Sequence, residues 1–317
     1  MNRRIFSTTV GGALLLAVVG TMFLEVQWTE TFRAPKSQGQ MGQMLWNGGS
    51  QVPFPSVAVI IPFNKWARRD ALLQSIRSIV DQTYQGHLET IVVDTSMDPR
   101  AEELDKISFQ RPVRIIHVQP PKDTWAGFPR NVGIHAAKDF EYVAFQDSDD
   151  VWFRNKLELQ FQFMNVFNSV FSTSDFVLPK RCRQSRQNGA TIWRDWSEEE
   201  MMASPIGNGG EYRTWIGSQQ GSLIKDGAYI PAMVDIRLME FSNLASTSSV
   251  VIKRSVLIDN NLLFDEKISD GKEDWELWKR IMRVAKIEMG YLSRPTFALD
   301  RVCHGGLPTA YQKRNLR

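Results

Sequence analysis

The sequence contains little cysteine and no marked excess of charge of either sign. Only Cys182 and Cys303 occur among 317 residues, too few for a disulfide scaffold or for a zinc site with four cysteine ligands. Lys and Arg number 38 and Asp and Glu number 35, so the formal net charge is +3 and no nucleic-acid-binding surface is expected. We expect both cysteines to be buried free thiols; a single disulfide is the alternative if the domain faces an oxidising compartment.

Two motifs that hold phosphates in many α/β proteins are also missing. The chain has no Gly-x-Gly-x-x-Gly pattern and no Gly-rich loop that ends in Gly-Lys-Ser/Thr, which argues against a dinucleotide site or a P-loop. No internal repeat is present. There is no Asn-x-Ser/Thr sequon either, a point against a glycosylating lumen.

The N-terminal segment is apolar and uncharged. Ile5 to Leu24 is long enough to span a bilayer as a helix, and two arginines precede it. The positive-inside rule favours a type II orientation, which places the rest of the chain in the lumen or outside the cytoplasm. A cleaved signal peptide with Val10 to Val19 as its apolar core is the alternative. We expect a single-pass membrane anchor at 1–24, a stem rich in Gln, Gly, Ser and Pro at 25–55, and a folded domain at 56–317.

Strand-like and helix-like patterns alternate through the first half of the folded domain. Short apolar runs predict four strands, at 57–62, 88–94, 113–118 and 142–145. Between them, helical spacing predicts a helix capped by Asp70 and another over 128–138. This alternation predicts an α/β fold with a mostly parallel sheet and helices on both faces.

The second half of the chain is less regular. It predicts helices over 155–167 and 271–281, a strand at 246–252, and a last strand from Phe297 that runs into His304. The polar region 180–240 contains several tryptophans and glycines. We expect it to be an insertion that binds the acceptor through its aromatic rings; a small subsidiary core is the alternative.

Acidic residues follow two of the predicted strands. Asp94 ends the second strand, and Asp147, Asp149 and Asp150 follow the fourth. Ligands of parallel sheets bind at the carboxyl ends of the strands. Carboxylates packed together repel one another, and a hard divalent cation with oxygen ligands is their usual neutraliser. We expect a metal and nucleotide site at Asp147 and Asp149, whereas Asp150 is expected to cap the helix that follows.

Seven motifs in order resemble those of the family 2 glycosyltransferases, which have the GT-A fold. They are Val57–Pro62, Ser75–Tyr84, Ile91–Asp94, Pro129–Gly133, Gln146–Asp150, Glu273–Trp278 and His304–Gly306. Each motif alone is weak, but all seven in the family's order form a specific pattern. The family commonly has Asp-Asp-Gly-Ser after the second strand, where this chain has Asp94-Thr95-Ser96-Met97.

The resemblance implies an inverting, metal-dependent enzyme. It would transfer a sugar from a nucleoside diphosphate sugar, expected to be a UDP-sugar, to a glycan or other hydroxyl acceptor. The nucleotide site implied by the family consists of Pro62, Phe63, Asn64, Asp94, Arg130, Asp147 and Ser148. The implied ligands of Mn²⁺ or Mg²⁺ are Asp147, Asp149 and His304. Asp274 is implied as the general base, with Glu273 supporting it or contacting the acceptor.

Two other functions fit parts of the pattern. One is a non-catalytic, membrane-tethered protein of the same fold that binds nucleotide sugars or glycans. The presence of Asp147, Asp149 and Asp274 together argues against it, because loss of activity removes the need for all three. The other is a nucleotidyltransferase, which shares the alternating sheet but usually opens with a Gly-rich phosphate loop that is missing after Val57.

Overall fold

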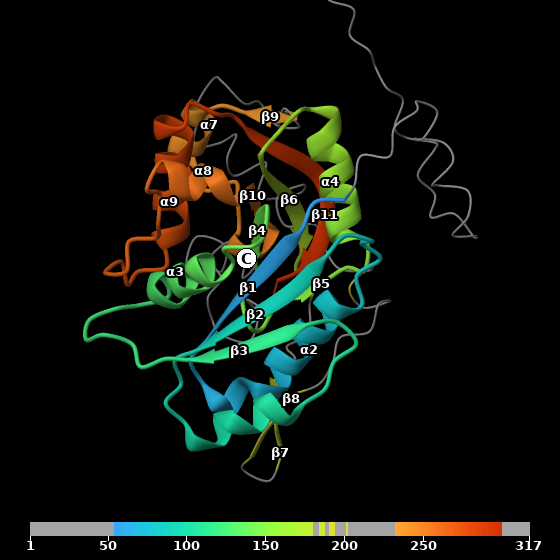
Figure 1. The fold of residues 1–317 in the computed structure, drawn as a ribbon, viewed down its shortest axis with the longest axis vertical. Helices are drawn as coiled ribbons and strands as arrows, with labels where there is room; N and C mark the ends of the chain where they lie inside the picture. Colours follow the sequence, from blue (N-terminus) through green and yellow to red (C-terminus); the bar gives the residue numbers. More distant parts are fainter. Residues whose placement is uncertain (1–53, 180–183, 188–189, 194–200, 202–231, 300–317) are drawn as a thin grey trace, which may run out of the picture. The chain divides into compact units, whose positions relative to one another are not determined.

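The computed structural model describes residues 54–179, 184–187, 190–193, 201 and 232–299 (Figure 1). The chain divides into two units, and the described residues all belong to the second, Pro53–Arg317. The predicted anchor and stem, Cys182, Cys303 and His304 lie outside the described residues, as does most of the region 180–240. Over the part that is described, no helix combines the length and apolarity needed to cross a membrane.

The described residues form an α/β domain. Its strands are β1 (Val57–Phe63), β2 (Leu88–Asp94), β3 (Val113–His117), β4 (Tyr142–Phe145), β5 (Val151–Trp152), β6 (Phe171–Val177), β7 (Gln184–Gln187), β8 (Ala190–Trp193), β9 (Met233–Val234), β10 (Val251–Lys253) and β11 (Met289–Ala298). Its α-helices are α2 (Arg69–Val80), α3 (Gly127–Ala136), α4 (Lys156–Val166), α7 (Ile236–Phe241), α8 (Arg254–Asp259) and α9 (Glu273–Val284). Three 3₁₀ segments complete them: η1 (Trp66–Arg68), η2 (Pro99–Lys106) and η3 (Thr247–Ser249).

The main sheet has the strand order β3-β2-β1-β4-β10-β6-β11-β5, with β9 beside β11. Strands β3, β2, β1 and β4 are parallel, as the sequence predicts. Strand β10 then runs antiparallel to both β4 and β6, and β11 is antiparallel to β5 and β9. Strand β11 is, however, parallel to β6. The sheet is therefore mixed: its first four strands match the expectation of a mostly parallel sheet, and the rest combines parallel and antiparallel pairs. Strands β7 and β8 form a separate hairpin.

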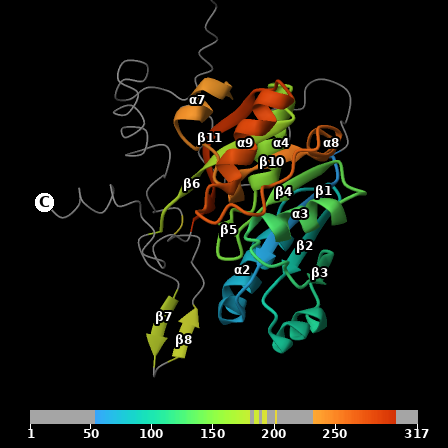
Figure 2. The same ribbon diagram turned by 90° about the vertical axis from the view of Figure 1, so that its left-hand side faces the viewer.

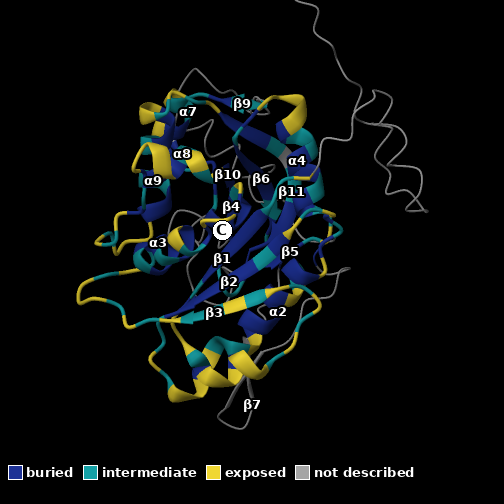
Figure 3. Cartoon of the chain, viewed as in Figure 1, coloured by how far each residue is buried: buried dark blue, intermediate teal, exposed yellow. Residues whose placement is uncertain are grey.

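Helices cover both faces of the sheet, and β1 explains why (Figures 1 and 2). Side chains alternate across a strand, so Ala58 and Ile60 face one core cluster while Val57, Val59 and Ile61 face the other. The first cluster includes residues of α3, α8 and α9, and the second includes residues of α2 and α4. A strand buried on both sides must be apolar throughout, and Figure 3 shows β1 and its neighbour β4 as buried.

Gly133 allows α3 to lie directly on β1. A Cβ atom at this position would be 2.4 Å from Cγ2 and 3.0 Å from Cγ1 of Ile60. Ile60 is fully buried, so it has no room to give way. The glycine of the Pro129–Gly133 motif thus sets the distance between helix and sheet, and with it the position of the Arg130 side chain one turn earlier.

Replacing Gly133 by Ala is therefore expected to lower the free energy of unfolding by about 1–2 kcal/mol. Overpacking costs about 1–3 kcal/mol, and the gain of about 1 kcal/mol in helix propensity offsets only part of it. Urea denaturation measures the difference. In an Ile60→Ala background the clashing carbons are absent, so the same substitution should be neutral or stabilising there. An equal cost in both backgrounds would contradict the packing explanation.

Three local predictions are wrong. Asp70 is the second residue of α2 and no side-chain cap is formed, because the helix begins at Arg69. Asp150 caps no helix, because β5 intervenes and α4 begins only at Lys156. The predicted strand at 246–252 begins only at Val251, because the hydroxyl-rich residues before it form the 3₁₀ turn η3; such side chains bond to nearby backbone and compete with a strand.

Candidate functional site

The loop that follows β4 is fixed by buried hydrogen bonds, including contacts with α2 and η3. The Gln146 side-chain amide donates to the Asp150 carbonyl at 2.9 Å, and the Ser75 hydroxyl of α2 donates to the same carbonyl. Ser248 of η3 accepts from the Asp147 backbone N–H at 2.9 Å and donates to Asp150 Oδ2 at 2.5 Å. Asp150 is 1 % exposed, so it has a structural role. The loop is fixed in a way that leaves Asp147 and Asp149 partly exposed.

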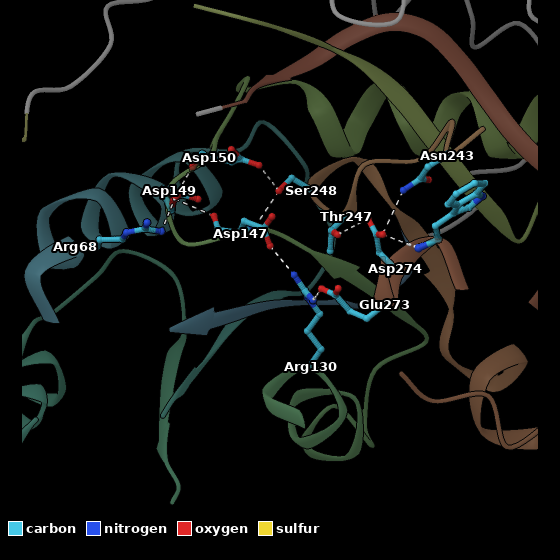
Figure 4. Close-up of polar contacts among 12 residues, drawn as sticks. Arg68, Arg130, Asp147, Asp149, Asp150, Asn243, Thr247, Ser248, Glu273 and Asp274 are labelled. Atoms are coloured by element: carbon cyan, nitrogen blue, oxygen red, sulfur yellow. Dashed lines mark hydrogen bonds and ion pairs between the residues drawn. The ribbon is translucent and has the colours of Figure 1, made fainter. Parts of the chain in front are cut away.

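Each of these two partly exposed carboxylates pairs with an arginine (Figure 4). Asp147 Oδ1 accepts from Arg130 Nη2 at 2.8 Å, and Asp149 Oδ2 accepts from Arg68 Nη1 at 3.0 Å. Burial raises the pKa of Asp147, Arg130 opposes this, and the nearby charge of Asp149 adds to the rise. The two carboxylates therefore repel each other as the sequence implies, and guanidinium groups supply the balancing charge.

Arg130 joins this loop to helix α9. Its Nη1 donates to Glu273 Oε1 at 2.6 Å while its Nη2 binds Asp147. Only 5 % of the Arg130 side chain and 8 % of the Glu273 side chain are exposed. Figure 4 shows the guanidinium between the two carboxylates. Residues of helix α3, the β4 loop and helix α9 thus meet at one place.

Asp274, the residue after Glu273, is buried among hydrogen-bond donors. Its Oδ2 accepts from Thr247 Oγ1 at 2.9 Å. Its Oδ1 accepts from Asn243 Nδ2 at 3.2 Å and from the Trp275 backbone N–H at 2.6 Å. Burial raises the pKa of Asp274 to about 6, and the charge of Glu273 adds to this rise. A carboxylate with this pKa is ionised at neutral pH and is more basic than an exposed one, as a general base requires.

Asp94, at the end of β2, is 4 % exposed and held in one orientation. Its Oδ1 accepts from the Ser96 backbone N–H at 2.9 Å, and its Oδ2 lies 2.9 Å from Nδ1 of His117. The second ring nitrogen of His117 lies 3.1 Å from Oδ2 of Asp105. Burial lowers the pKa of His117, but the hydrogen bonds to the two carboxylates outweigh it and the pKa is raised. His117 pairs with Asp94 in the sheet register, a contact that the sequence analysis missed.

The loop after β1 lies beside this position. Phe63 accepts, through its backbone carbonyl, a hydrogen bond of 2.7 Å from the Thr95 N–H. Its ring is 1 % exposed and belongs to the core, so only its backbone is available to a ligand. Pro62 is half-buried and Asn64 is exposed. Ser148 is half-buried between the two carboxylates of the β4 loop.

The predicted metal ligands are placed only in part. Asp147 and Asp149 lie on one loop, whereas His304 is outside the described residues. Over those residues, no group of three or more His, Cys, Asp or Glu side chains is placed to hold a metal ion. The residues that sequence reasoning missed at this site are Arg68, His117, Asn243, Thr247 and Ser248. No motif marks them, since each acts through a partner far away in the sequence.

Comparison with known proteins agrees with this geometry. The model of a protein family described as "Glycosyl transferase family 2" matches residues 58–223, slightly more than half of the chain. The chain belongs to glycosyl transferase family 2. Apart from Val57, the four parallel strands lie within the matched region, as do the β4 loop and Arg130.

Among the family's proteins, similar chains come from several bacteria. An uncharacterized glycosyltransferase of Rickettsia bellii is 37% identical over 120 residues, which cover 38% of this chain and 16% of that protein. The UDP-Glc:alpha-D-GlcNAc-diphosphoundecaprenol beta-1,3-glucosyltransferase WfaP of Escherichia coli is 31% identical over 112 residues, 35% of this chain and 43% of WfaP. The matched region thus spans less than half of either relative.

A solved structure of the S. aureus protein TarS, residues 1-349, has the same fold. It superposes with a TM-score of 0.53 at 17% identity, covering 77% of this chain and 60% of that one. A structure of the same TarS fragment in complex with UDP-GlcNAc gives a TM-score of 0.52. At this identity the likeness concerns the fold, and it confirms the GT-A architecture of this family 2 chain.

Proposed function

We propose that the protein is an inverting glycosyltransferase that moves a sugar from a nucleoside diphosphate sugar, in the first instance a UDP-sugar, to a glycan or other hydroxyl acceptor. The observation that carries this proposal is the Arg130 bridge, which joins the loop of Asp147 to the helix of Glu273 and Asp274. One guanidinium thus joins the loop proposed to bind the nucleotide to the first turn of the helix that carries the basic carboxylate Asp274, and this arrangement suits a reaction between two bound substrates. Family membership and the UDP-GlcNAc complex of TarS support the donor class.

In this mechanism Asp274 takes a proton from the acceptor hydroxyl. The hydroxyl oxygen forms a bond to the anomeric carbon from the face opposite the leaving group. The bond from that carbon to the diphosphate breaks, and its electron pair leaves with the nucleoside diphosphate. One displacement inverts the anomeric centre. Glu273 holds Arg130 beside Asp147, and Asp94, with the backbone of the β1 loop, is suited to hold the base of the nucleotide.

A divalent cation fits the residues on the β4 loop. Asp147 and Asp149 offer oxygen ligands, which Mg²⁺ and Mn²⁺ prefer. One or two carboxylates with substrate phosphates and water are a common way to hold Mg²⁺, so a cation here would bind together with the donor. His304 is proposed as a further ligand. The cation would supply Lewis-acid neutralisation of the charge on the leaving diphosphate.

A screen of nucleotide sugars by thermal shift with Mn²⁺ tests the donor class. A ligand that binds the folded state raises the free energy of unfolding by mass action, by about 2.7 kcal/mol when its concentration is 100 times the dissociation constant, and this raises the melting temperature. We expect one UDP-sugar to stand out, followed by slow release of UDP in the absence of acceptor. Binding without any UDP release, with Mn²⁺ present, would favour the non-catalytic binding protein instead.

Replacing Asp149 by Ala is expected to abolish the metal-dependent part of donor binding. Calorimetry should show that the variant, with Mn²⁺ present, binds UDP only as tightly as the wild type does after a chelator has removed the metal. Asp139→Ala, an exposed position just before β4, is the matched control and should behave as wild type. Equal wild-type affinity with and without chelator would contradict a metal at this loop.

The membrane anchor at 1–24 remains part of the proposal, with the catalytic domain in the lumen or outside the cytoplasm. It rests on the uncharged run Ile5 to Leu24 and the two preceding arginines. The full chain should remain in the membrane fraction after alkaline carbonate extraction, whereas the chain from 25 onward should not. Release of the intact full chain by carbonate would contradict the anchor.

A further inference from the structure

The 3₁₀ turn η3 presents three buried hydroxyl groups in three directions. Thr247, Ser248 and Ser249 are 4 %, 0 % and 0 % exposed. The turn is closed by backbone hydrogen bonds from Ser249 to Ser246 at 2.9 Å and from Val250 to Thr247 at 3.1 Å. Each hydroxyl contacts a different element: helix α9, the β4 loop and strand β6. A turn this buried has a structural role, and through its three hydroxyl groups it also connects α9, the β4 loop and β6.

Ser249 and its carbonyl anchor the turn to the core. The Ser249 hydroxyl lies 2.5 Å from the hydroxyl of Thr173 on β6. The Ser249 carbonyl accepts from Lys156 Nζ at 3.0 Å and from Gln160 Nε2 at 2.8 Å. Lys156 is fully buried on α4, and burial lowers its pKa. These two buried donors of α4 thus hold the turn against the helix.

Ser248 ties the turn to the β4 loop. It accepts from the Asp147 N–H and donates to Asp150 Oδ2, and its carbonyl accepts from Trp152 Nε1 at 2.9 Å. The loop that carries Asp147 and the turn that carries Thr247 therefore cannot move independently. Figure 4 shows Ser248 and Thr247 between the carboxylates of the loop and Asp274.

Thr247 contacts one oxygen of Asp274, and the two oxygens differ. Each carboxylate oxygen can accept about two hydrogen bonds. Oδ1 already accepts two, from Asn243 and from the Trp275 N–H. Among the described residues Oδ2 accepts one, from Thr247. Oδ2 therefore keeps a lone pair for a further proton donor, and the hydroxyl of Thr247 fixes where that lone pair points.

We propose that Thr247 is a positioning residue, and that Oδ2 of Asp274 is the atom that receives the proton of the acceptor hydroxyl. This inference rests on the proposed function, since it specifies the base of that reaction. The chemistry is unchanged: the acceptor oxygen bonds to the anomeric carbon, the diphosphate leaves with the electron pair, and the proton ends on Oδ2. The rotation of a carboxylate about its last bond is otherwise loosely restricted, so one donor on each oxygen is needed to hold it.

Thr247→Val, in the full chain, tests this assignment. The variant keeps the shape of the side chain and removes the donor to Oδ2. The pKa of Asp274, measured by NMR of chains with carboxyl-¹³C-labelled Asp and assigned with Asp274→Asn, should rise, because the charged form loses a hydrogen bond. UDP release from the donor found in the screen should slow by about 10- to 100-fold in kcat. The affinity for UDP should stay as in wild type.

Three further variants separate positioning from stability. Thr247→Ser keeps the hydroxyl and should restore both the pKa and kcat; Thr247→Ala serves if the Val variant does not fold. Thr173→Val removes the hydroxyl contact on the far side of the same turn, and should lower the melting temperature without moving the pKa of Asp274. Asn243→Ala removes a donor to Oδ1 and should cost less in kcat than Thr247→Val.

Several results would overturn the proposal. They are an unchanged pKa in Thr247→Val, failure of Thr247→Ser to rescue, a pKa change in Thr173→Val as large as in Thr247→Val, or a greater loss of kcat in Asn243→Ala. Failure of the proposed function looks different. In that case Asp274→Asn itself releases UDP at the wild-type rate, whereas the NMR measurement of the Thr247 contact remains interpretable.

Discussion

Replacing Asp274 by Asn is expected to reduce glycosyl transfer by about 10²- to 10⁴-fold, the range that a positioned general base contributes. An amide oxygen is not basic at neutral pH, so the acceptor hydroxyl would keep its proton. The shape of the side chain is preserved, and the Thr247 hydroxyl can rotate to accept from the new amide. UDP affinity should not change, because α9 reaches the β4 loop through Glu273 and Arg130. Initial rates and calorimetry with UDP measure the two quantities.

The same substitution is expected to stabilise the fold at neutral pH. The pKa of Asp274 is raised from 3.8 to about 6 by burial and by Glu273. The folded state therefore binds more protons than the unfolded state between these values, and the free energy of unfolding falls as pH rises through about 6. The ionised carboxylate costs on the order of 2–3 kcal/mol at pH 8. Asn avoids that cost, so activity and stability should change in opposite directions.

Urea denaturation at pH 5 and pH 8 tests the sign. Wild type should lose more stability over this interval than Asp274→Asn, and wild-type transfer should decline below about pH 6 as the base becomes protonated. Asp139→Asn, an exposed site, is the control for the substitution type and should follow wild type. Transfer within tenfold of wild type, or the same pH dependence of stability in both proteins, would contradict the role of Asp274.

Sequence reasoning succeeded where the signal was local. The run Val57–Pro62 predicts a strand buried on both faces, and β1 is one. Asp94 and Asp147 end or follow parallel strands, and this rule brings them to one edge of the sheet without knowledge of their partners. The Glu273–Trp278 motif places two carboxylates at the start of a helix, where the structure has them.

It failed where the stabilising contacts are distant in sequence. Strand β6 carries Ser172, Thr173, Ser174 and Asp175 in a row, all buried, so no apolar run marks it. Each of these side chains bonds to a partner on another element: α4, η3 or β11, as in the 2.6 Å contact of Ser174 with Thr296. Buried polar groups need such partners, and a sequence does not show them. Strand β6 was missed for this reason.

The same limit applies to the site. The acidic residues were predictable, but the side chains that neutralise their charge or fix their orientation were not. Arg68 lies 81 residues from Asp149, and Thr247 lies 27 residues from Asp274. Sequence alone indicated a cation as the neutraliser of the carboxylates. In the structure Arg68 and Arg130 also neutralise part of the charge of Asp149 and Asp147.

Replacing Arg130 by Met is expected to cost about 3–5 kcal/mol of stability and to abolish UDP binding. Removing one partner of a buried ion pair leaves the other charge without compensation. Here two carboxylates lose their partner at once, and Glu273 is the more deeply buried, with 8 % of its side chain exposed. Lys at this position should rescue only part of the loss, because an ammonium group lacks the planar fork that reaches both carboxylates. Urea denaturation and calorimetry with UDP measure the effects.

The double variant Arg130→Met with Glu273→Gln separates this electrostatic cost from simple loss of packing against Phe264, whose ring centre lies 5.4 Å from the guanidinium carbon. Neutralising Glu273 removes the buried charge that the first substitution leaves unpaired. The double variant should therefore be more stable than Arg130→Met alone, although Glu273→Gln by itself should destabilise the wild type. Strictly additive losses would show that Arg130 contributes chiefly through packing, and the bridge between the β4 loop and α9 would then not be what holds Asp147 and Asp274 in one site.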